Sequence, residues 1–127
     1  MSYVLDSSVI LAKFFEEPGA GSIDDQIIAE GRISTVNLSE VIAKLAEQSV
    51  AQDQIDYIRE QFAPRTHDFD AEQARTAGLL RPATRAAGLS LGDRACLALA
   101  LSLDTPVLTA DRAWAGLDLG ARIEVVR

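Results

Sequence analysis

Four acidic residues are placed where their carboxylates could hold a divalent metal ion. Asp6 and Asp111 each follow a short apolar run, and Glu40 and Asp93 each lie near the start of a helical pattern. Carboxylates that are grouped together repel one another and raise one another's pKa values unless a cation lies between them. Mg²⁺ prefers oxygen ligands and keeps water molecules for chemistry. The four acids therefore predict a Mg²⁺ site, with Mn²⁺ as a second candidate ion.

The elements that must position these acids alternate between strand and helix, which is typical of an α/β fold. Apolar and β-branched runs predict five strands, at residues 3–5, 32–36, 65–69, 106–109 and 123–126. Helical patterns cover residues 7–15, 23–30, 53–62, 70–88 with a break at Pro82, 91–103, and a turn at 111–114, and a further helix begins at 37 and has apolar positions up to 45. Because most strands are apolar on both faces, we expect a parallel sheet with helices on both sides, in one domain spanning residues 1–127.

Helix caps and topology place the four acids at the same edge of that sheet. The helix after the second strand is predicted to begin at Asn37, which puts Glu40 in its first turn. Ser90 is predicted to cap the helix over residues 91–103, which puts Asp93 in its first turn. A helix that runs antiparallel to its strand starts at the edge where the parallel strands end, and ligands collect at that edge.

Each acid also has a purely structural interpretation, which is the more common one when it is taken singly. Residues 37–40 and 90–93 both match capping boxes, in which the acid accepts a backbone N–H. Asp111 could be an N-cap and Asp6 could start an Asx turn. The metal site is favoured by the conjunction, since all four acids are expected at one edge.

Other catalytic chemistries lack their residues. His67, the single histidine, falls within a predicted strand away from that edge, and Cys96 is the single cysteine. Neither a histidine acid–base pair nor a Ser or Cys triad can be built, so water activated by a metal ion is the remaining nucleophile. A lone thiol, with no signal peptide and no membrane-spanning run, predicts a cytoplasmic protein.

The charge balance weighs against a nucleic-acid partner. The formal net charge is −7, whereas phosphate binding depends on Lys and Arg. Without the four candidate acids the net charge becomes −3, and ten of the twelve basic residues are Arg, which binds phosphate through two parallel hydrogen bonds. Arg94 and Arg112, next to two of the acids, and with less support Arg81 and Arg85, are candidates for phosphate contacts; local salt bridges are the alternative.

Four segments together resemble the signature of PIN domains, in particular the VapC toxins of bacterial toxin–antitoxin pairs. They are Val-Leu-Asp-Ser-Ser at 4–8, Asn-Leu-Ser-Glu-Val at 37–41, Leu-Gly-Asp-Arg-Ala at 91–95 and Leu-Thr-Ala-Asp-Arg-Ala-Trp at 108–114. The resemblance covers the whole chain. It implies a three-layer sandwich with a parallel sheet of four or five strands in the order 3-2-1-4-5.

The resemblance also implies an activity and partners. Asp6, Glu40, Asp93 and Asp111 match the family's four acids, so we expect a Mg²⁺-dependent endoribonuclease, the toxin of a type II toxin–antitoxin pair. Thr109 matches a hydroxyl residue that supports the metal site, and Ser7 or Ser8 is expected to do the same.

The partners implied are RNA, a VapB-like antitoxin and a second copy of the chain. Apolar Val50, Ile55 and Ile58 are candidates for a face that one domain leaves uncovered. The rival hypothesis is a PIN scaffold without catalysis, which binds RNA or protein.

Overall fold

Five strands of two or three residues form the sheet in the computed structural model, which describes residues 2–126. They are β1 (Val4–Leu5), β2 (Ile33–Ser34), β3 (Thr66–His67), β4 (Val107–Thr109) and β5 (Ile123–Val125). β1, β4 and β5 pair in parallel, as do β2 and β3. A parallel bridge between Val4 and Arg32 joins the two groups, with the Leu5 N–H 2.8 Å from the Arg32 carbonyl oxygen. The predicted order 3-2-1-4-5 is therefore confirmed.

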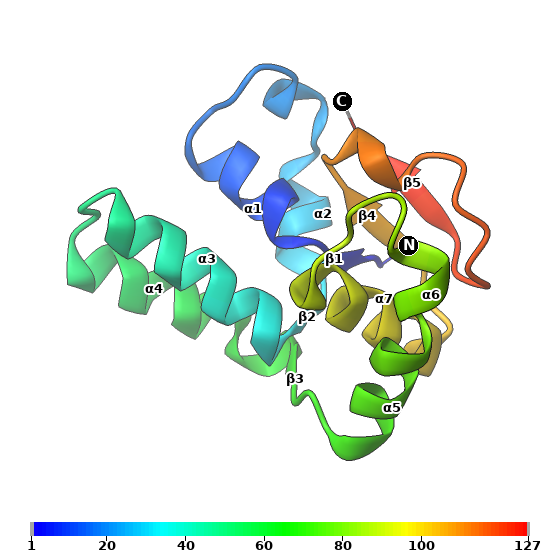
Figure 1. Cartoon of the computed structure of the whole chain (residues 1–127). Helices are drawn as coiled ribbons and strands as arrows, with labels where there is room; N and C mark the ends of the chain where they lie inside the picture. The colour runs from blue at the N-terminus through cyan, green and yellow to red at the C-terminus, as the bar shows by residue number, and fades with distance from the viewer. Residues whose placement is uncertain (1, 127) are drawn as a thin grey trace.

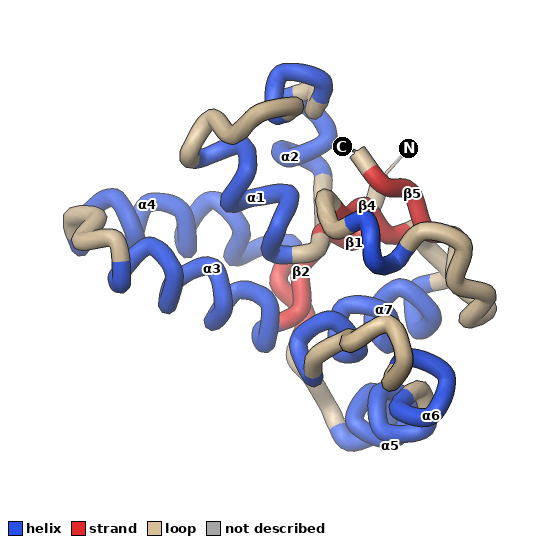
Figure 2. Tube along the Cα trace, turned by 45° about the horizontal axis from the view of Figure 1, so that its top comes forward, coloured by secondary structure: helices blue, strands red, loops and turns tan. Residues whose placement is uncertain are grey.

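Helices cover both faces of this sheet, as Figures 1 and 2 show. They are α1 (Ser7–Phe14), α2 (Asp25–Glu30), α3 (Thr35–Glu47), α4 (Gln52–Phe62), α5 (Ala71–Leu79), α6 (Arg81–Thr84) and α7 (Leu91–Leu103), with 3-10 helices η1 (Ala20–Ser22), η2 (Ala63–Arg65) and η3 (Arg112–Trp114). α1 and α2 lie on one side and α5, α6 and α7 on the other. α3 and α4 lie side by side and extend away from the β2–β3 end. This is the expected three-layer arrangement.

Alternation along the strands divides the core into two. Val4 pairs with Val107 and Leu5 with Leu108. The two valines pack with α7, whereas the two leucines pack with α1 and α3. Successive strand residues point to opposite faces, so two adjacent apolar residues per strand serve both cores. The middle of α7 is buried almost completely, and Cys96 within it has no exposed surface.

The predicted strand over residues 32–36 is too long, and the helix after it starts earlier than predicted. Thr35 and Val36 are β-branched and resemble strand residues, yet they form the first turn of α3. The Ser34 hydroxyl accepts the Val36 N–H at 3.2 Å and caps the helix. The capping box predicted at residues 37–40 is therefore wrong, and Glu40 lies in the second turn of α3 rather than the first.

Several other boundaries differ from the prediction by one to four residues. The helix predicted over 23–30 starts only at Asp25, because Asp24 caps it, and the strand predicted over 65–69 contracts to β3. The break at Pro82 is confirmed, since α5 ends before it and Pro82 lies in the first turn of α6. Ile55, expected to be uncovered, is buried. Within residues 2–126, no helix combines the length and the apolar character that crossing a membrane requires.

Candidate metal centre

Asp6 lies at the end of β1 and is nearly fully buried, at 3% exposure. Its Oδ2 accepts the Ser8 hydroxyl at 2.6 Å and the Thr109 hydroxyl at 2.9 Å. Its Oδ1 is buried and has no hydrogen-bond partner. The side chain caps no helix, so the turn interpretation of Asp6 is not realised. A buried carboxylate oxygen without a donor is costly in a fold, and a bound cation would remove that cost.

Burial raises the pKa of the Asp6 carboxyl from its ordinary value of 3.8 to about 6. The hydrogen bonds from Ser8 and Thr109 lower the pKa, while the negative charges of Asp93 and Glu40 raise it further. The environment of Asp6 therefore disfavours its charged form unless a nearby cation supplies positive charge.

Glu40 is held from two sides. Its Oε1 accepts the Asn37 amide at 2.9 Å and the Ser7 hydroxyl at 3.2 Å. The same Asn37 amide group donates to the Gly92 carbonyl oxygen at 3.0 Å, so α3 is tied to the start of α7. Gly92 lies so close to the Glu40 carboxylate that a Cβ at position 92 would overlap it.

Asp93 and Asp111 are held by the starts of their own helices. The Ser90 N–H donates to Asp93 Oδ2 at 2.8 Å and the Ser90 hydroxyl accepts the Asp93 N–H, which confirms the predicted capping box. Asp111 Oδ1 accepts the Ala113 N–H at 2.9 Å and caps η3, so the predicted N-cap is also confirmed. These bonds occupy one oxygen of each carboxylate.

The electrostatics couple the four acids, which together form what we call the acidic cluster: Asp6, Glu40, Asp93 and Asp111. Partial burial raises the pKa of Asp93, and the charge of Asp111 raises it further. Among residues 2–126, no three Asp, Glu, His or Cys side chains are arranged closely enough to hold a metal ion as they stand. The fit to Mg²⁺ rests on the oxygen donor set and on the unpartnered Oδ1 of Asp6. That all four acids are ligands remains a prediction.

Hydroxyl groups support the cluster from β4 and α1. Thr109, predicted as a supporting residue, is fully buried; besides donating to Asp6 it accepts the Asp111 N–H at 3.1 Å. Ser8 accepts the Ala110 N–H at 3.0 Å while donating to Asp6. Ser7 contacts Glu40 instead. The two neighbouring serines therefore serve different acids, because successive residues of α1 point in different directions.

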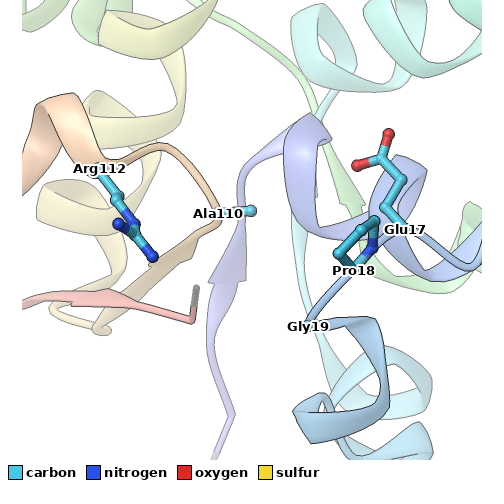
Figure 3. Close-up of a pocket in the computed structure, with 5 residues that line it drawn as sticks. All are labelled: Glu17, Pro18, Gly19, Ala110 and Arg112. Carbon is cyan, nitrogen blue, oxygen red and sulfur yellow. The ribbon is translucent and has the colours of Figure 1, made fainter.

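The candidate phosphate-binding arginines lie in different environments. Arg94 turns from the start of α7 toward α5 and donates to the Ala77 carbonyl oxygen at 3.0 Å. Arg81 and Arg85 are exposed around α6. Arg112 lines a hollow of about 730 Å³ together with Ala110 and residues 17–19, as Figure 3 shows. Ala110 and Arg112 are the two chain neighbours of Asp111. A phosphate-binding role remains a prediction for each arginine.

Two residues of the site were not assigned a role from the sequence. Asn37 was interpreted as the start of a helix, and Gly92 received no role. The sequence marks these two residues only by their positions within the segments at 37–41 and 91–95 that resemble the family. Their contact could not be predicted, because it joins residues 55 positions apart. His67 lies in β3 with its ring 3.1 Å from the Arg32 guanidinium, away from the cluster as expected.

The family model for the PIN domain matches residues 3–119. The chain belongs to the PIN domain family. The resemblance of the four segments is thereby confirmed, together with the three-layer fold that it implied. No curated relative matches this PIN domain.

Solved structures share the fold over nearly the whole of both chains. FitAcB from Neisseria gonorrhoeae is 21% identical, with a TM-score of 0.75 over 97% of this chain and 96% of that one. DNA-bound VapBC from Salmonella typhimurium is 23% identical, with a TM-score of 0.71 over 100% and 99%. VapBC-5 from Mycobacterium tuberculosis, from the VapBC family of toxin–antitoxin systems, is 26% identical, with a TM-score of 0.61 over 99% and 98%.

Proposed function

We propose that this PIN domain is a metal-dependent endoribonuclease and the toxin of a type II toxin–antitoxin pair. The observation that carries the proposal is the Asp6 carboxylate, which is buried beside further acids and has one oxygen without a partner. Such a group is unfavourable on its own and becomes favourable when a cation binds. A structural acid would instead have both oxygens hydrogen-bonded or exposed to water.

Mg²⁺ or Mn²⁺ would be held by Asp6 and Asp93, with Asp111 and Glu40 as further direct or water-mediated ligands. When bound, the ion supplies an activated water molecule at neutral pH and neutralises charge on the phosphodiester. Ser8 and Thr109 hold Oδ2 of Asp6, which leaves Oδ1 as its free ligand atom.

The RNA would approach the acidic cluster along the hollow that is lined by the two chain neighbours of Asp111, Ala110 and Arg112. Arg112 lines it and carries a positive charge beside Asp111. Phosphate contacts from Arg112 and from the exposed Arg85 would offset the negative net charge. Arg94 would have to leave the Ala77 carbonyl oxygen to make such a contact.

An apolar hollow supports the toxin role. It has a volume of about 220 Å³ and is lined by residues of α1, α2 and α4, namely Ile10, Lys13, Phe14, Ile28, Ile58, Gln61 and Phe62. Phe14 is 38% exposed, although its ring is large and apolar. The VapBC-5 structure comes from a toxin–antitoxin system. We infer that an apolar segment of a VapB-like antitoxin covers this hollow, and that the complex contains two copies of the PIN domain.

The decisive experiment is RNA cleavage by the purified protein with and without Mg²⁺ or Mn²⁺. Wild type is compared with Asp6→Asn and Asp93→Asn, and with Asp56→Asn, an exposed acid of α4 that serves as the matched control. We expect discrete products that require metal, vanish in the first two variants and persist in the control. If wild type and all variants treat every RNA alike, with no antitoxin copurified, the nuclease hypothesis is wrong and the domain is a binding scaffold.

A further inference from the structure

The side chain of Asn37 is fully buried within α3, although it is polar and lies beside an acid. Its Nδ2 makes two hydrogen bonds, to Glu40 Oε1 at 2.9 Å and to the Gly92 carbonyl oxygen at 3.0 Å. Its Oδ1 is buried and has no partner. Burying an amide costs free energy when one of its atoms remains unbonded, so this side chain is a poor choice for packing alone.

A capping role does not explain Asn37 either. It is the third residue of α3, and the helix is already capped by Ser34. Its two bonds lead instead to Glu40 and to the residue before Asp93. Asn37 thus links Glu40 on α3 to the backbone at the start of α7, one residue before Asp93.

We propose that Asn37 is a positioning residue that, together with Gly92, holds Glu40 at the acidic cluster for metal binding. The inference rests on the proposed function, since it concerns the same site. Asn37 and Ser7 both donate to Oε1 of Glu40. Gly92 provides the space that the carboxylate occupies, because any Cβ there would overlap it. Both of these hydrogen bonds are accepted by Oε1, while Oε2 lies against Gly92.

The test is a double-mutant cycle on the full chain that measures Mn²⁺ affinity by electron paramagnetic resonance. The four proteins are wild type, Asn37→Ala, Glu40→Gln and the double variant. Substitution of a residue that orients a metal ligand typically weakens metal binding about 10- to 100-fold. We expect Asn37→Ala to weaken Mn²⁺ binding about tenfold in wild type and to have no further effect when Glu40 is already Gln.

A second readout separates positioning from simple loss of stability. With RNA as substrate, we expect Asn37→Ala to lower kcat and leave KM nearly unchanged, because Asn37 does not touch RNA. Gly92→Ala displaces the Glu40 carboxylate from the α7 side. It replaces Asn37→Ala in the cycle if that variant does not fold. Its Mn²⁺ affinity is expected to fall only when Glu40 is present.

Equal losses of Mn²⁺ affinity with and without Glu40, or no loss in either background, would overturn the inference even if the protein cleaves RNA. Conversely, Mn²⁺ binding that follows the expected cycle without RNA cleavage supports the positioning role and rejects the nuclease. If the wild-type protein binds no Mn²⁺, both proposals are wrong.

Discussion

The two halves of the acidic cluster are built in different ways. Asp6 and Glu40 are held by side-chain donors, among them Thr109, which lies 103 positions from Asp6 in the sequence. Asp93 and Asp111 are held by backbone N–H groups within three residues of themselves. Asp6 is buried and Asp93 partly so, while Asp111 is exposed.

This difference shows which acids are positioned by the whole fold and which are positioned by a short segment alone. The position of Asp6 requires β1, α1 and β4 to assemble, so its unfavourable charge is imposed by tertiary structure. The caps at Asp93 and Asp111 need only a helix start, whose exposed N–H groups attract negative charge. Changes at Asp6 should therefore have larger effects than changes at Asp111.

The largest effect is expected for Asp6→Asn. We expect RNA cleavage to fall at least about 100-fold, about 2.7 kcal/mol in activation free energy. The metal-free variant should nevertheless be more stable than wild type at pH 7. The folded-state pKa of Asp6 is about 6 and its ordinary value is 3.8, so ionisation favours unfolding. This penalty is absent below pH 3.8, grows as the pH rises and is complete above about pH 6.

Denaturant unfolding of the metal-free proteins from pH 4 to pH 7 measures this penalty. The stability advantage of Asp6→Asn should increase by up to about 3 kcal/mol across that range. If the difference in unfolding free energy between variant and wild type does not change with pH, ionisation of Asp6 does not destabilise the folded protein. The contrast between the two halves of the cluster would then disappear.

The next largest effect is expected from metal binding itself. An ion that binds only the folded protein stabilises it by about 2.7 kcal/mol at a free concentration about 100 times its Kd. We expect Mn²⁺ to raise the thermal midpoint of the wild-type protein and to leave that of Asp6→Asn nearly unchanged. Ca²⁺-free buffer and EDTA reversal provide the controls. Equal stabilisation of both proteins would place the ion elsewhere.

Thr109→Val is expected to have an intermediate effect. Valine keeps the shape but loses the hydroxyl that donates to Asp6 and accepts the Asp111 N–H. We expect a loss of about 1–2 kcal/mol in the free energy of unfolding. The pKa of Asp6 should rise further, so the acidic limb of the pH–rate profile should move to higher pH. Thr109→Ser keeps the hydroxyl and should restore the profile; an unchanged profile in the valine variant would contradict this role.

The smallest effect is expected for Asp111→Asn. Asparagine caps helices as well as aspartate does, so the free energy of unfolding should change by less than about 0.5 kcal/mol. RNA cleavage should fall about tenfold, or about 1.4 kcal/mol, through the lost charge alone. Thermal unfolding and cleavage rates measured together check both expectations. A loss as large as that for Asp6→Asn would show that exposure does not rank the acids.

Local signals predicted the sheet and three of the four acids in their observed places. Asp6 and Asp111 follow strands, and the Ser90 cap defines the start of α7. Glu40 was misplaced by one turn because Thr35 and Val36 have strand-like side chains, whereas the Ser34 cap makes them the first turn of α3.

The contacts that hold Glu40, and the unpartnered oxygen of Asp6, could not be predicted from the sequence. The bond from Asn37 to Gly92 needs two helices to meet, and nothing near either residue indicates the other. The unpartnered Oδ1 of Asp6 is likewise a property of the packed site, because it depends on which donors approach Oδ2. Sequence reasoning thus found the four acids, the caps of Asp93 and Asp111 and the Thr109 hydroxyl, but not the contacts of Glu40 with Asn37 and Gly92.

Cys96, the single cysteine, lies in the middle of α7 with no exposed surface. Burial raises the pKa of its thiol well above the ordinary value, and the charges of the acids raise it further. The folded protein therefore presents no thiolate to an alkylating reagent, and labelling must wait until α7 leaves the core. The rate of Cys96 alkylation would therefore measure how often the core around α7 opens in the native protein.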